Sequence, residues 1–316
     1  MEDTRASPTC VFMTGVTSGQ SYFHGIRCVI RRLRLLHSRI PLVVAVPPTE
    51  VEHTERELKG YLGANVSLLR WKRIEHDVTH LNMFHAKRWS GTRVLDKLNV
   101  LNAPFRRVVW LDADVLLKRN VDHLCALPPN VSFYAVLNHG FEPRTCWTRN
   151  GRFADQCREC RHHGLHRDEL AASYWVREGV RQQAAGNRSG MAPCTYEYNS
   201  GVMVLEPLNR SAFHEQVVNP IRRGKVPSSD GSDQGFLNSL IHGHHLFGQR
   251  HEALSSTYNV VHRVQMLRGA TWKRLDPAIV HLVGARKPWG DDARRDSISR
   301  PSPYFEQERE WLRWCG

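Results

Sequence analysis

The sequence predicts an α/β protein with a mostly parallel sheet and helices on both of its faces. The first observation is a short apolar run, 11–16, followed by 22–37, where apolar side chains recur at helical spacing. The second is that the alternation continues through a strand at 42–46, a helix at 50–61 and a strand at 66–71. Strands that alternate with helices at this pitch are typical of parallel sheets covered by helices.

The remainder of the chain extends this pattern, with one interruption. We expect a helix at 92–101, strands at 108–111 and 132–137, a polar turn entering a strand at 199–205, a helix at 209–223, a loop entering a helix at 229–240, a strand at 279–283 and a helix at about 304–314. Residues 139–198 are rich in Arg, His, Cys and Gly and have little strand character. We interpret them as an insertion over the sheet, and therefore expect a single domain over residues 1–316.

Composition is that of an ordinary soluble protein, with 41% hydrophobic and 24% charged residues. No stretch approaches the roughly 18 apolar residues of a membrane span, so none is expected. The first ten residues are polar and the first apolar run is too short for a signal-peptide core, so we expect a cytoplasmic protein. The sequons at Asn65, Asn130, Asn187 and Asn209 are then expected to stay unmodified.

The formal net charge of +13 favours anionic partners such as nucleotide diphosphates, nucleic acid or an anionic membrane surface. The base composition of the genome and a solvated surface are the alternative explanation. The chain has no nucleic-acid motif and no basic stripe interleaved with aromatic residues, so we expect no nucleic-acid partner.

The eight cysteines fall into two groups. The first group lies in the insertion and contains Cys146, Cys157, Cys160 and Cys194. The second group is scattered along the chain and contains Cys10, Cys28, Cys125 and Cys315. Thiolates with nearby histidines would suit a structural zinc ion, although the spacing fits no standard finger. Free cytosolic thiols, or an oxidised pair in a compartment where disulfides are rare, are the alternatives that the sequence leaves open.

Two carboxylates, Asp112 and Asp114, directly follow the buried strand at 108–111. Acids at the end of a buried strand are costly unless a positive group meets them. A hard divalent cation that also holds a diphosphate suits them, since Mg²⁺ and Mn²⁺ take one or two carboxylates together with substrate phosphates. The alternative is a loop whose acids cap the next turn.

Other polar residues also follow predicted strands. Ligands of parallel sheets bind beyond the carboxyl ends of the strands, so the turn at 17–22 and the two carboxylates can share a pocket. A glycine and a lysine after the strand at 279–283, Gly284 and Lys287, are suited to a phosphate. Simpler alternatives exist for three further residues: a core histidine for His281, a helix N-cap for Asp233 and a solvated charge for Lys97.

Several of these segments, taken in order, resemble glycosyltransferase family 8, the glycogenin-like retaining transferases. The segments are VFMTGVTSGQSYFHG from Val11, Arg88, DKL at Asp96–Leu98, WLDADVLL from Trp110, YNSGVMVL from Tyr198, DGSDQGFLN from Asp230, STYN at Ser256–Asn259 and VHLVGARKPW from Val280. Together they span about residues 11–289. The resemblance implies a GT-A type fold with a Rossmann-like sheet.

Within the family the chain looks most similar to the galactinol synthase branch, which transfers galactose from UDP-galactose to myo-inositol in the cytosol. The similarity rests on the spacing of Thr14, Tyr22 and Gly25, on NVDHLCALP followed by FYAV, on the first three insertion cysteines and on YNVVHRVQMLR from Tyr258. Glycogenin glucosylates its own tyrosine a few residues after the YN motif. No tyrosine follows at that position here, so we expect no self-glucosylation.

The family resemblance also implies roles for individual residues. Asp112, Asp114 and His281 are expected to bind Mn²⁺, which in turn binds the UDP diphosphate. Residues expected to contact the UDP-sugar are Val16, Ser18, Gly19, Tyr22, Arg88, Lys97, Ala113, Asn199, Ser200, Gly201, Asp230, Gly284 and Lys287. Residues expected at the reacting sugar are Asp233, Gln234 and Lys97.

The expected activity is retaining transfer of a hexose from a UDP-sugar to a polyol or glycan acceptor. An amide such as Gln234 is a poor nucleophile, so we expect front-face departure and attack rather than a covalent intermediate. The alternatives are a glycogenin-like or glycan-extending glucosyltransferase and, from another class, a nucleotide-sugar-binding protein without turnover. A homodimer is compatible with the sequence.

Overall fold

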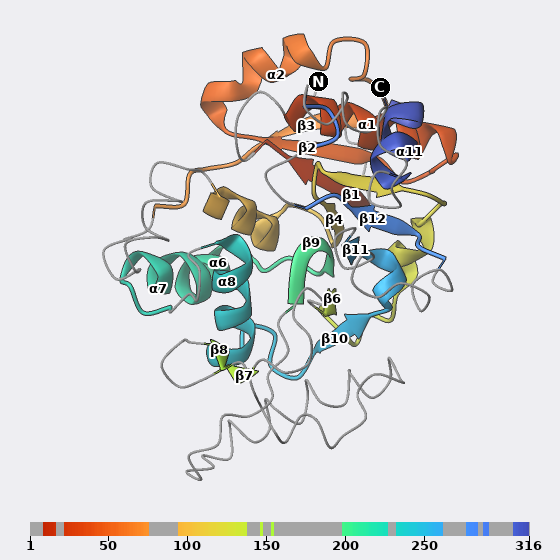
Figure 1. Cartoon of the computed structure of the whole chain (residues 1–316). Helices are drawn as coiled ribbons and strands as arrows, with labels where there is room; N and C mark the ends of the chain where they lie inside the picture. Colours follow the sequence, from red (N-terminus) through yellow and green to blue (C-terminus); the bar gives the residue numbers. More distant parts are fainter. Residues whose placement is uncertain are drawn as a thin grey trace.

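The computed structural model describes residues 9–16, 22–75, 94–137, 146–147, 153–154, 198–226, 232–261, 276–283, 287–290 and 306–315. A seven-stranded sheet forms its centre (Figure 1). The strands, in their order across the sheet, are β10 (His251–Leu254), β6 (Phe133–Leu137), β9 (Tyr198–Leu205), β4 (Arg107–Leu111), β1 (Cys10–Gly15), β2 (Leu42–Val46) and β3 (Val66–Arg70).

Most neighbouring strands of this sheet are parallel, which confirms the expected fold class. β1 pairs in parallel with β2 and β4, β2 with β3, and β10 with β6. β9 is the exception, since it runs antiparallel between β4 and β6. Side chains of β1 alternate between two cores, with Val11 and Met13 in one and Phe12 in the other. A sheet buried on both faces accounts for the nearly continuous apolar strands of the sequence.

Helices cover both faces of the sheet. One face carries α1 (Tyr22–Leu35), α2 (Val51–Glu57), which the short turn η1 (Pro48–Glu50) precedes, and η3 (Asp122–Ala126). The other carries η2 (Val94–Asn102), the continuous helical segment α6–η4–α7 (Arg210–Phe213, His214–Val218, Asn219–Arg222) and α8–η5 (Asp233–Asn238, Ser239–Gly243). Helix α1 forms because Ile26, Val29, Ile30 and Leu33 recur at helical spacing and are buried.

A second, three-stranded sheet was not expected from the sequence. It contains β11 (Val260–Val261), β12 (Ile279–His281) and β5 (Val115–Leu117), and β12 pairs antiparallel with β5. The short turn η6 (Ser256–Tyr258) precedes β11. Since β5 follows β4 after three residues, this sheet carries a late segment of the chain to the end of the central strand.

Some boundaries and types differ from the expectations. The helix expected at 92–101 is a 3₁₀ helix, η2, and α2 ends four residues before position 61. The segment expected to be a polar turn before a strand, at 199–201, is itself part of β9. Of the insertion, the structure describes the backbone of β7 (Cys146–Trp147) and β8 (Phe153–Ala154), which pair with each other, so the proposed zinc site lies outside the described residues.

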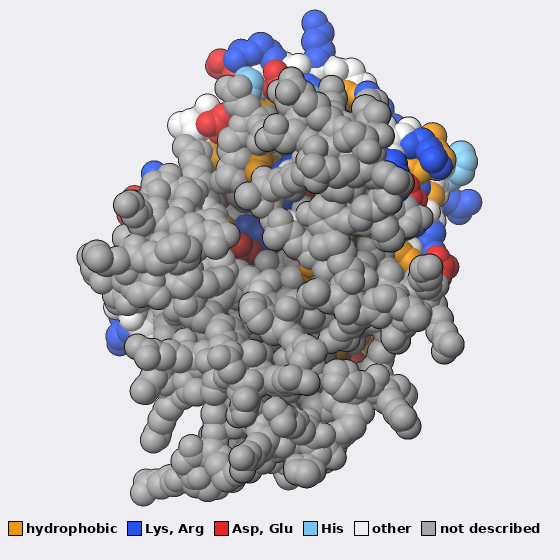
Figure 2. Space-filling view, in the orientation of Figure 1, with side chains coloured by type: hydrophobic (Ala, Val, Ile, Leu, Met, Phe, Trp, Pro, Cys, Tyr) orange, Lys and Arg blue, Asp and Glu red, His pale blue; other side chains and the backbone are white. Residues whose placement is uncertain are grey.

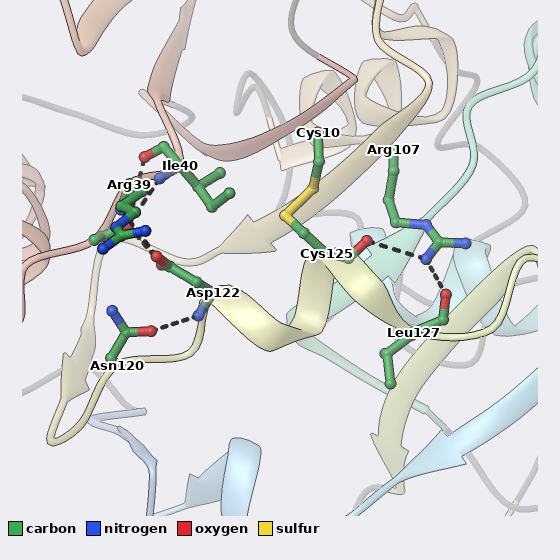
Figure 3. The surroundings of a disulfide bond; sticks show 9 residues. Cys10, Arg39, Ile40, Arg107, Asn120, Asp122, Cys125 and Leu127 are labelled. Atoms are coloured by element: carbon green, nitrogen blue, oxygen red, sulfur yellow. Dashed lines mark hydrogen bonds between the residues drawn. A yellow bond between two sulfur atoms is a disulfide. The ribbon is translucent and has the colours of Figure 1, made fainter.

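The four scattered cysteines form two disulfides. The first joins Cys10 of β1 to Cys125 of η3, with a Cα–Cα distance of 5.9 Å (Figure 3). Beside it the Arg107 guanidinium donates hydrogen bonds to the carbonyls of Cys125 and Leu127. Asp122 accepts a hydrogen bond of 2.9 Å from the Arg39 backbone N–H and so ties η3 to the loop before β2.

The second disulfide joins Cys28 of α1 to Cys315 of α11 (Glu306–Cys315), across 287 positions of sequence. Helix α11 lies against α1 (Figure 1). Arg31 donates to the Cys315 carbonyl at 3.0 Å, and Lys118 pairs with Glu310 at 2.9 Å. The C-terminal helix is thereby held by a covalent bond, a hydrogen bond and an ion pair.

Basic side chains gather on the outer surface of the described part. Figure 2 shows them over α2 and near the C-terminal end of α1, where Arg31, Arg34 and Arg39 are exposed. In the part of the chain that the structure describes, no helix is both long and apolar enough to cross a membrane.

We expect the Cys28–Cys315 disulfide to contribute strongly to stability, because it closes a loop of nearly the whole chain. Replacing both cysteines by alanine is expected to lower the free energy of unfolding by about 2–5 kcal/mol. Urea denaturation of the oxidised protein and of the double variant measures this difference. Reduction also breaks Cys10–Cys125, so the reduced protein should be no more stable than the double variant, and equal stability of the oxidised protein and the double variant would contradict the prediction.

Candidate functional site

The site begins at the end of β4, where Asp112 and Asp114 leave the central sheet. The antiparallel register pairs Leu111 with Val202, so the next residue, Asp112, lies opposite Gly201 and donates its N–H to the Gly201 carbonyl at 2.8 Å. The start of β9 therefore lies beside the end of β4. This explains why polar residues belong to a buried strand: they are the part of β9 that reaches the site.

The imidazole of His281 reaches the same place through the second sheet. The register of β12 against β5 sets His281 opposite Val115, and the Leu282 N–H donates to the Asp114 carbonyl at 2.9 Å. His281 Nε2 lies 3.1 Å from Asp114 Oδ1 and 3.7 Å from Asp112 Oδ2. Each of the three side chains offers a ligand atom within 4.8 Å of the others. The three residues that the family resemblance implies as metal ligands therefore lie together, although they come from distant parts of the chain.

The side-chain amides of Asn199 and Asn259 determine the hydrogen-bonding role of His281 Nδ1. Gly201 N–H donates to Asn199 Oδ1 at 2.9 Å, which identifies that atom as oxygen, because a backbone N–H can only donate. Asn259 Nδ2 donates to the same oxygen at 2.7 Å, so its own Oδ1 faces His281 Nδ1 at 3.0 Å as an acceptor. Nδ1 therefore donates its N–H to Asn259, and Nε2 is the nitrogen that faces the carboxylates and would bind a cation once it is deprotonated.

Gly201 is required by the close approach of His281. A Cβ at position 201 would lie 2.2 Å from Cε1 and 2.4 Å from Nδ1 of the imidazole. Gly25 has a similar role in α1, where a Cβ would lie 2.0 Å from the carbonyl oxygen of Ala113. The two glycines let β9 and α1 pack directly against the turn that carries the carboxylates.

Lys287 pairs with the second carboxylate. Its ammonium contacts Asp114 Oδ2, donates to the Leu282 carbonyl at 3.1 Å and lies 5.7 Å from the centre of the Tyr22 ring. Burial alone would raise the pKa of the Asp114 carboxyl. The charges of His281 and Lys287 and their hydrogen bonds outweigh burial and hold that pKa below its ordinary value, so Asp114 is ionised.

Lys97 of η2 joins the first carboxylate to a third acid. Its buried ammonium lies 2.7 Å from Asp112 Oδ1 and 3.0 Å from Asp233 Oδ2, and it donates to Ser200 Oγ at 3.1 Å. Burial would lower the pKa of Lys97, but the charges of Asp112 and Asp233 hold it above its ordinary value. Trp110 donates its Nε1–H to Asp112 Oδ1 at 2.7 Å. The lysine is therefore a buried ion-pair partner rather than a solvated charge.

Asp233 and Gln234 begin α8 beside β9. The N-cap is Ser232, which accepts from the Gly235 N–H at 3.1 Å, so the capping role considered for Asp233 is wrong. The Asp233 carboxylate instead accepts from Ser200 Oγ at 2.7 Å. The side-chain carbonyl of Gln234 accepts from the Ser200 N–H at 3.2 Å.

The structure brings most of the predicted site residues into one neighbourhood. Val16 is buried at the end of β1, and Tyr22 begins α1 near Lys287. Five predicted residues lie outside the described residues: Ser18, Gly19, Arg88, Asp230 and Gly284. Two residues were missed, Asn259 and Trp110. Both residues lie in segments that the family resemblance rests on, STYN and WLDADVLL. The sequence does not show, however, which neighbouring side chain each of them hydrogen-bonds in the fold.

The donor set fits a divalent cation. Two carboxylate oxygens and one imidazole nitrogen converge, and each carboxylate keeps its other oxygen on a lysine, which fixes its orientation. The imidazole distinguishes this set from the all-oxygen sites that Mg²⁺ and Ca²⁺ prefer. The residues that would hold the cation are Asp112, Asp114 and His281.

Gly201→Ala is expected to weaken binding of Mn²⁺ by at least about 10-fold, because the added methyl group displaces the His281 ring. Gly243→Ala is the matched control, since a Cβ there would meet nothing within 4 Å. Calorimetric titration of both variants with Mn²⁺ measures the difference. Equal affinities in two folded variants would contradict the assignment of His281 as a ligand.

Asn259→Leu is expected to weaken Mn²⁺ binding by about 10- to 100-fold, because His281 Nδ1 loses the acceptor that fixes its proton. Asn259→Asp keeps an acceptor and should retain more affinity than the leucine variant. The same titration, with thermal unfolding as a check of the fold, measures both. The reverse order of affinities would refute the proton assignment.

Comparison with known proteins agrees with this geometry. Residues 18–293 match the family described as Glycosyl transferase family 8. Galactinol synthase 1 of Ajuga reptans is 24% identical over 90% of this chain and 76% of its own length. Galactinol synthase 2 of Arabidopsis thaliana is 25% identical over 95% of this chain and 79% of its own length. Glycogenin of Neurospora crassa is 33% identical, over 36% of this chain and 15% of its own.

Solved structures share the fold. The WbbM bifunctional glycosyltransferase has a TM-score of 0.56 at 14% identity, over 96% of this chain and 52% of its own. The galactosyltransferase LgtC, solved with donor and acceptor sugar analogues, has a TM-score of 0.50 at 17% identity, over 96% of this chain and 99% of its own. The fold is thus of the GT-A type. The family match covers most of the sequence, and the chain belongs to glycosyl transferase family 8.

Proposed function

We propose that this protein is a Mn²⁺-dependent hexosyltransferase that uses a UDP-sugar and retains configuration at the anomeric carbon. The observation that carries the proposal is the convergence of Asp112, Asp114 and His281 beside Lys287. When bound, the cation supplies Lewis acidity that neutralises charge on the leaving diphosphate. Family membership supports hexosyl transfer, and the ligand set supports the choice of Mn²⁺ over Mg²⁺.

Lys287 is proposed to exchange partners when the donor binds. Its ammonium pairs with Asp114 in the structure. A cation held by Asp112, Asp114 and His281 would compete with the ammonium for that carboxylate, and a donor diphosphate would attract it. Lys287 would thus exchange a carboxylate for a phosphate partner.

The sugar is proposed to lie against Lys97, Ser200, Asp233 and Gln234. The Asp233 carboxylate already accepts from Lys97 and Ser200, which weakens it as a nucleophile. The side-chain carbonyl of Gln234 is held by the Ser200 N–H, which leaves its NH₂ group to contact the sugar. Neither group is arranged for a covalent intermediate, which favours front-face attack, with a UDP oxygen taking the acceptor proton.

The acceptor is proposed to be a polyol, with myo-inositol and a UDP-galactose donor as the first candidates, because two galactinol synthases match over most of the chain. A glycan-extending glucosyltransferase is the second candidate, supported by the shorter glycogenin match. A binding protein without turnover is the third. The buried, fully paired acids and lysines of the site are costly to keep in a protein that only needs the fold.

A donor and acceptor panel tests this proposal. UDP-glucose, UDP-galactose and UDP-N-acetylglucosamine are each incubated with Mn²⁺ and with myo-inositol, simple sugars or the protein alone, and products are identified by mass spectrometry. We expect one donor to be used, with transfer to myo-inositol, and Asp114→Ala to abolish turnover without unfolding. Absence of any metal-dependent transfer or hydrolysis would refute the proposed enzymatic activity. Undiminished activity of Asp114→Ala would refute the role of Asp114 as a metal ligand.

Lys287→Ala is expected to have opposite effects on the two ligands. UDP binding in the presence of Mn²⁺ should weaken by about 1.5–3 kcal/mol, the usual contribution of a charged hydrogen bond. Binding of Mn²⁺ alone should be unchanged or tighter, because Asp114 loses a competing cation. Titrations with Mn²⁺ and then UDP measure both, with Lys287→Arg as the charge-preserving control. Parallel weakening of both ligands would contradict the exchange of partners.

A further inference from the structure

The disulfides indicate the compartment of the protein. Cys10–Cys125 and Cys28–Cys315 have Cα–Cα distances of 5.9 and 4.8 Å, within the usual range for disulfides. The paired cysteines are 115 and 287 positions apart, so each bond joins elements that meet only in the folded chain. Free thiols scattered through a cytosolic chain have no reason to meet in two separate pairs.

Both pairs also lie where they stabilise structure rather than act as redox groups. Cys28 is fully buried, Cys10 and Cys315 are 9% and 7% exposed, and Cys125 is partly buried. Thiols that exchange reversibly are accessible, whereas buried disulfides are structural. Structural disulfides form and persist in oxidising compartments and are rare in the cytosol.

A second feature agrees with an oxidising compartment. Three sequons, at Asn65, Asn130 and Asn209, lie in the described part of the chain, and all three asparagines are exposed. Asn65 lies in the turn before the edge strand β3, and Ser67 is exposed as well. A bulky solvated group at the start of an edge strand would shield that edge from pairing with another chain.

Asn209 shows that modification is compatible with the local structure. It is the N-cap of α6, where its Oδ1 accepts the Ala212 N–H at 2.9 Å. N-glycosylation uses the other atom of the amide, Nδ2. The cap therefore survives the modification, because the carbonyl oxygen is unchanged.

We propose that this protein folds in an oxidising compartment and carries N-linked glycans on Asn65, Asn130 and Asn209. In each transfer, the bond between the anomeric carbon of a lipid-linked diphospho-oligosaccharide and its phosphate oxygen breaks. A bond from that carbon to the asparagine Nδ2 forms, Nδ2 loses one proton, and the lipid diphosphate leaves. This location replaces the cytoplasmic one expected from the N-terminal sequence, and it does not depend on the identity of the sugar donor.

The test examines the full chain isolated from its source cells. The protein is denatured and treated with a maleimide before and after reduction, and its peptides are mapped by mass spectrometry. Cys10, Cys28, Cys125 and Cys315 should be labelled only after reduction, and the three sequon peptides should carry glycans. Labelling of these cysteines without reduction would overturn the compartment, and unmodified asparagines at all three sequons would overturn the glycan assignment.

Sequon variants secreted from a eukaryotic cell give a second readout. Ser67→Ala and Ser211→Ala should each remove one glycan while keeping Asn65 and the Asn209 cap. Ser67→Thr and Ser211→Thr keep the sequons and should keep the glycans. Alanine variants that retain full glycan mass would overturn the assignment of these two sites.

Discussion

The structure of the site depends on the neutralisation of two adjacent buried acids. Asp112 and Asp114 end the central strand, where unpaired charge would cost several kcal/mol, on the order of the effective penalty for burying an ion. Three positive or proton-bearing groups meet them: Lys97 from η2, and His281 and Lys287 from one late segment of the chain. These contacts hold the segments together, so the three possible ligand atoms lie within 4.8 Å of one another.

The antiparallel strands make this convergence possible. In a purely parallel sheet, the strand beside β4 would begin at the opposite end, and its first residues would lie far from the carboxylates. Because β9 runs the other way, Asn199, Ser200 and Gly201 begin where β4 ends. The antiparallel pairing of β12 with β5 likewise sets His281 beside Asp114. The antiparallel strands β9 and β12 thus supply side chains to the site, whereas in a purely parallel sheet only loops would reach it.

The sequence predicted the elements better than their contacts. Strand β2 and the start of α1 were predicted to the residue, because apolar spacing is a local signal. The short strands β5, β11 and β12 form a sheet only after distant segments meet, and no window of sequence records that pairing. Ser232 and Asp233 are both residue types that cap helices well, so the sequence could not show which of them is the N-cap of α8. In the structure Ser232 is the N-cap, and the Asp233 carboxylate pairs with Lys97 instead.

Helix α1 connects the stability of the C-terminus to the geometry of the site. One turn of the helix packs Gly25 against the carbonyl of Ala113, the residue between Asp112 and Asp114 in the sequence. The next turn carries Cys28, which is bonded to α11 and packs in the same small core as Leu116 of β5 and Val280 of β12. The disulfide therefore lies behind the strands that hold Asp114 and His281. The same helix contacts the turn that carries the carboxylates and is bonded to α11. Loss of the Cys28–Cys315 disulfide would therefore change the spacing of the proposed metal ligands before it changed the central sheet.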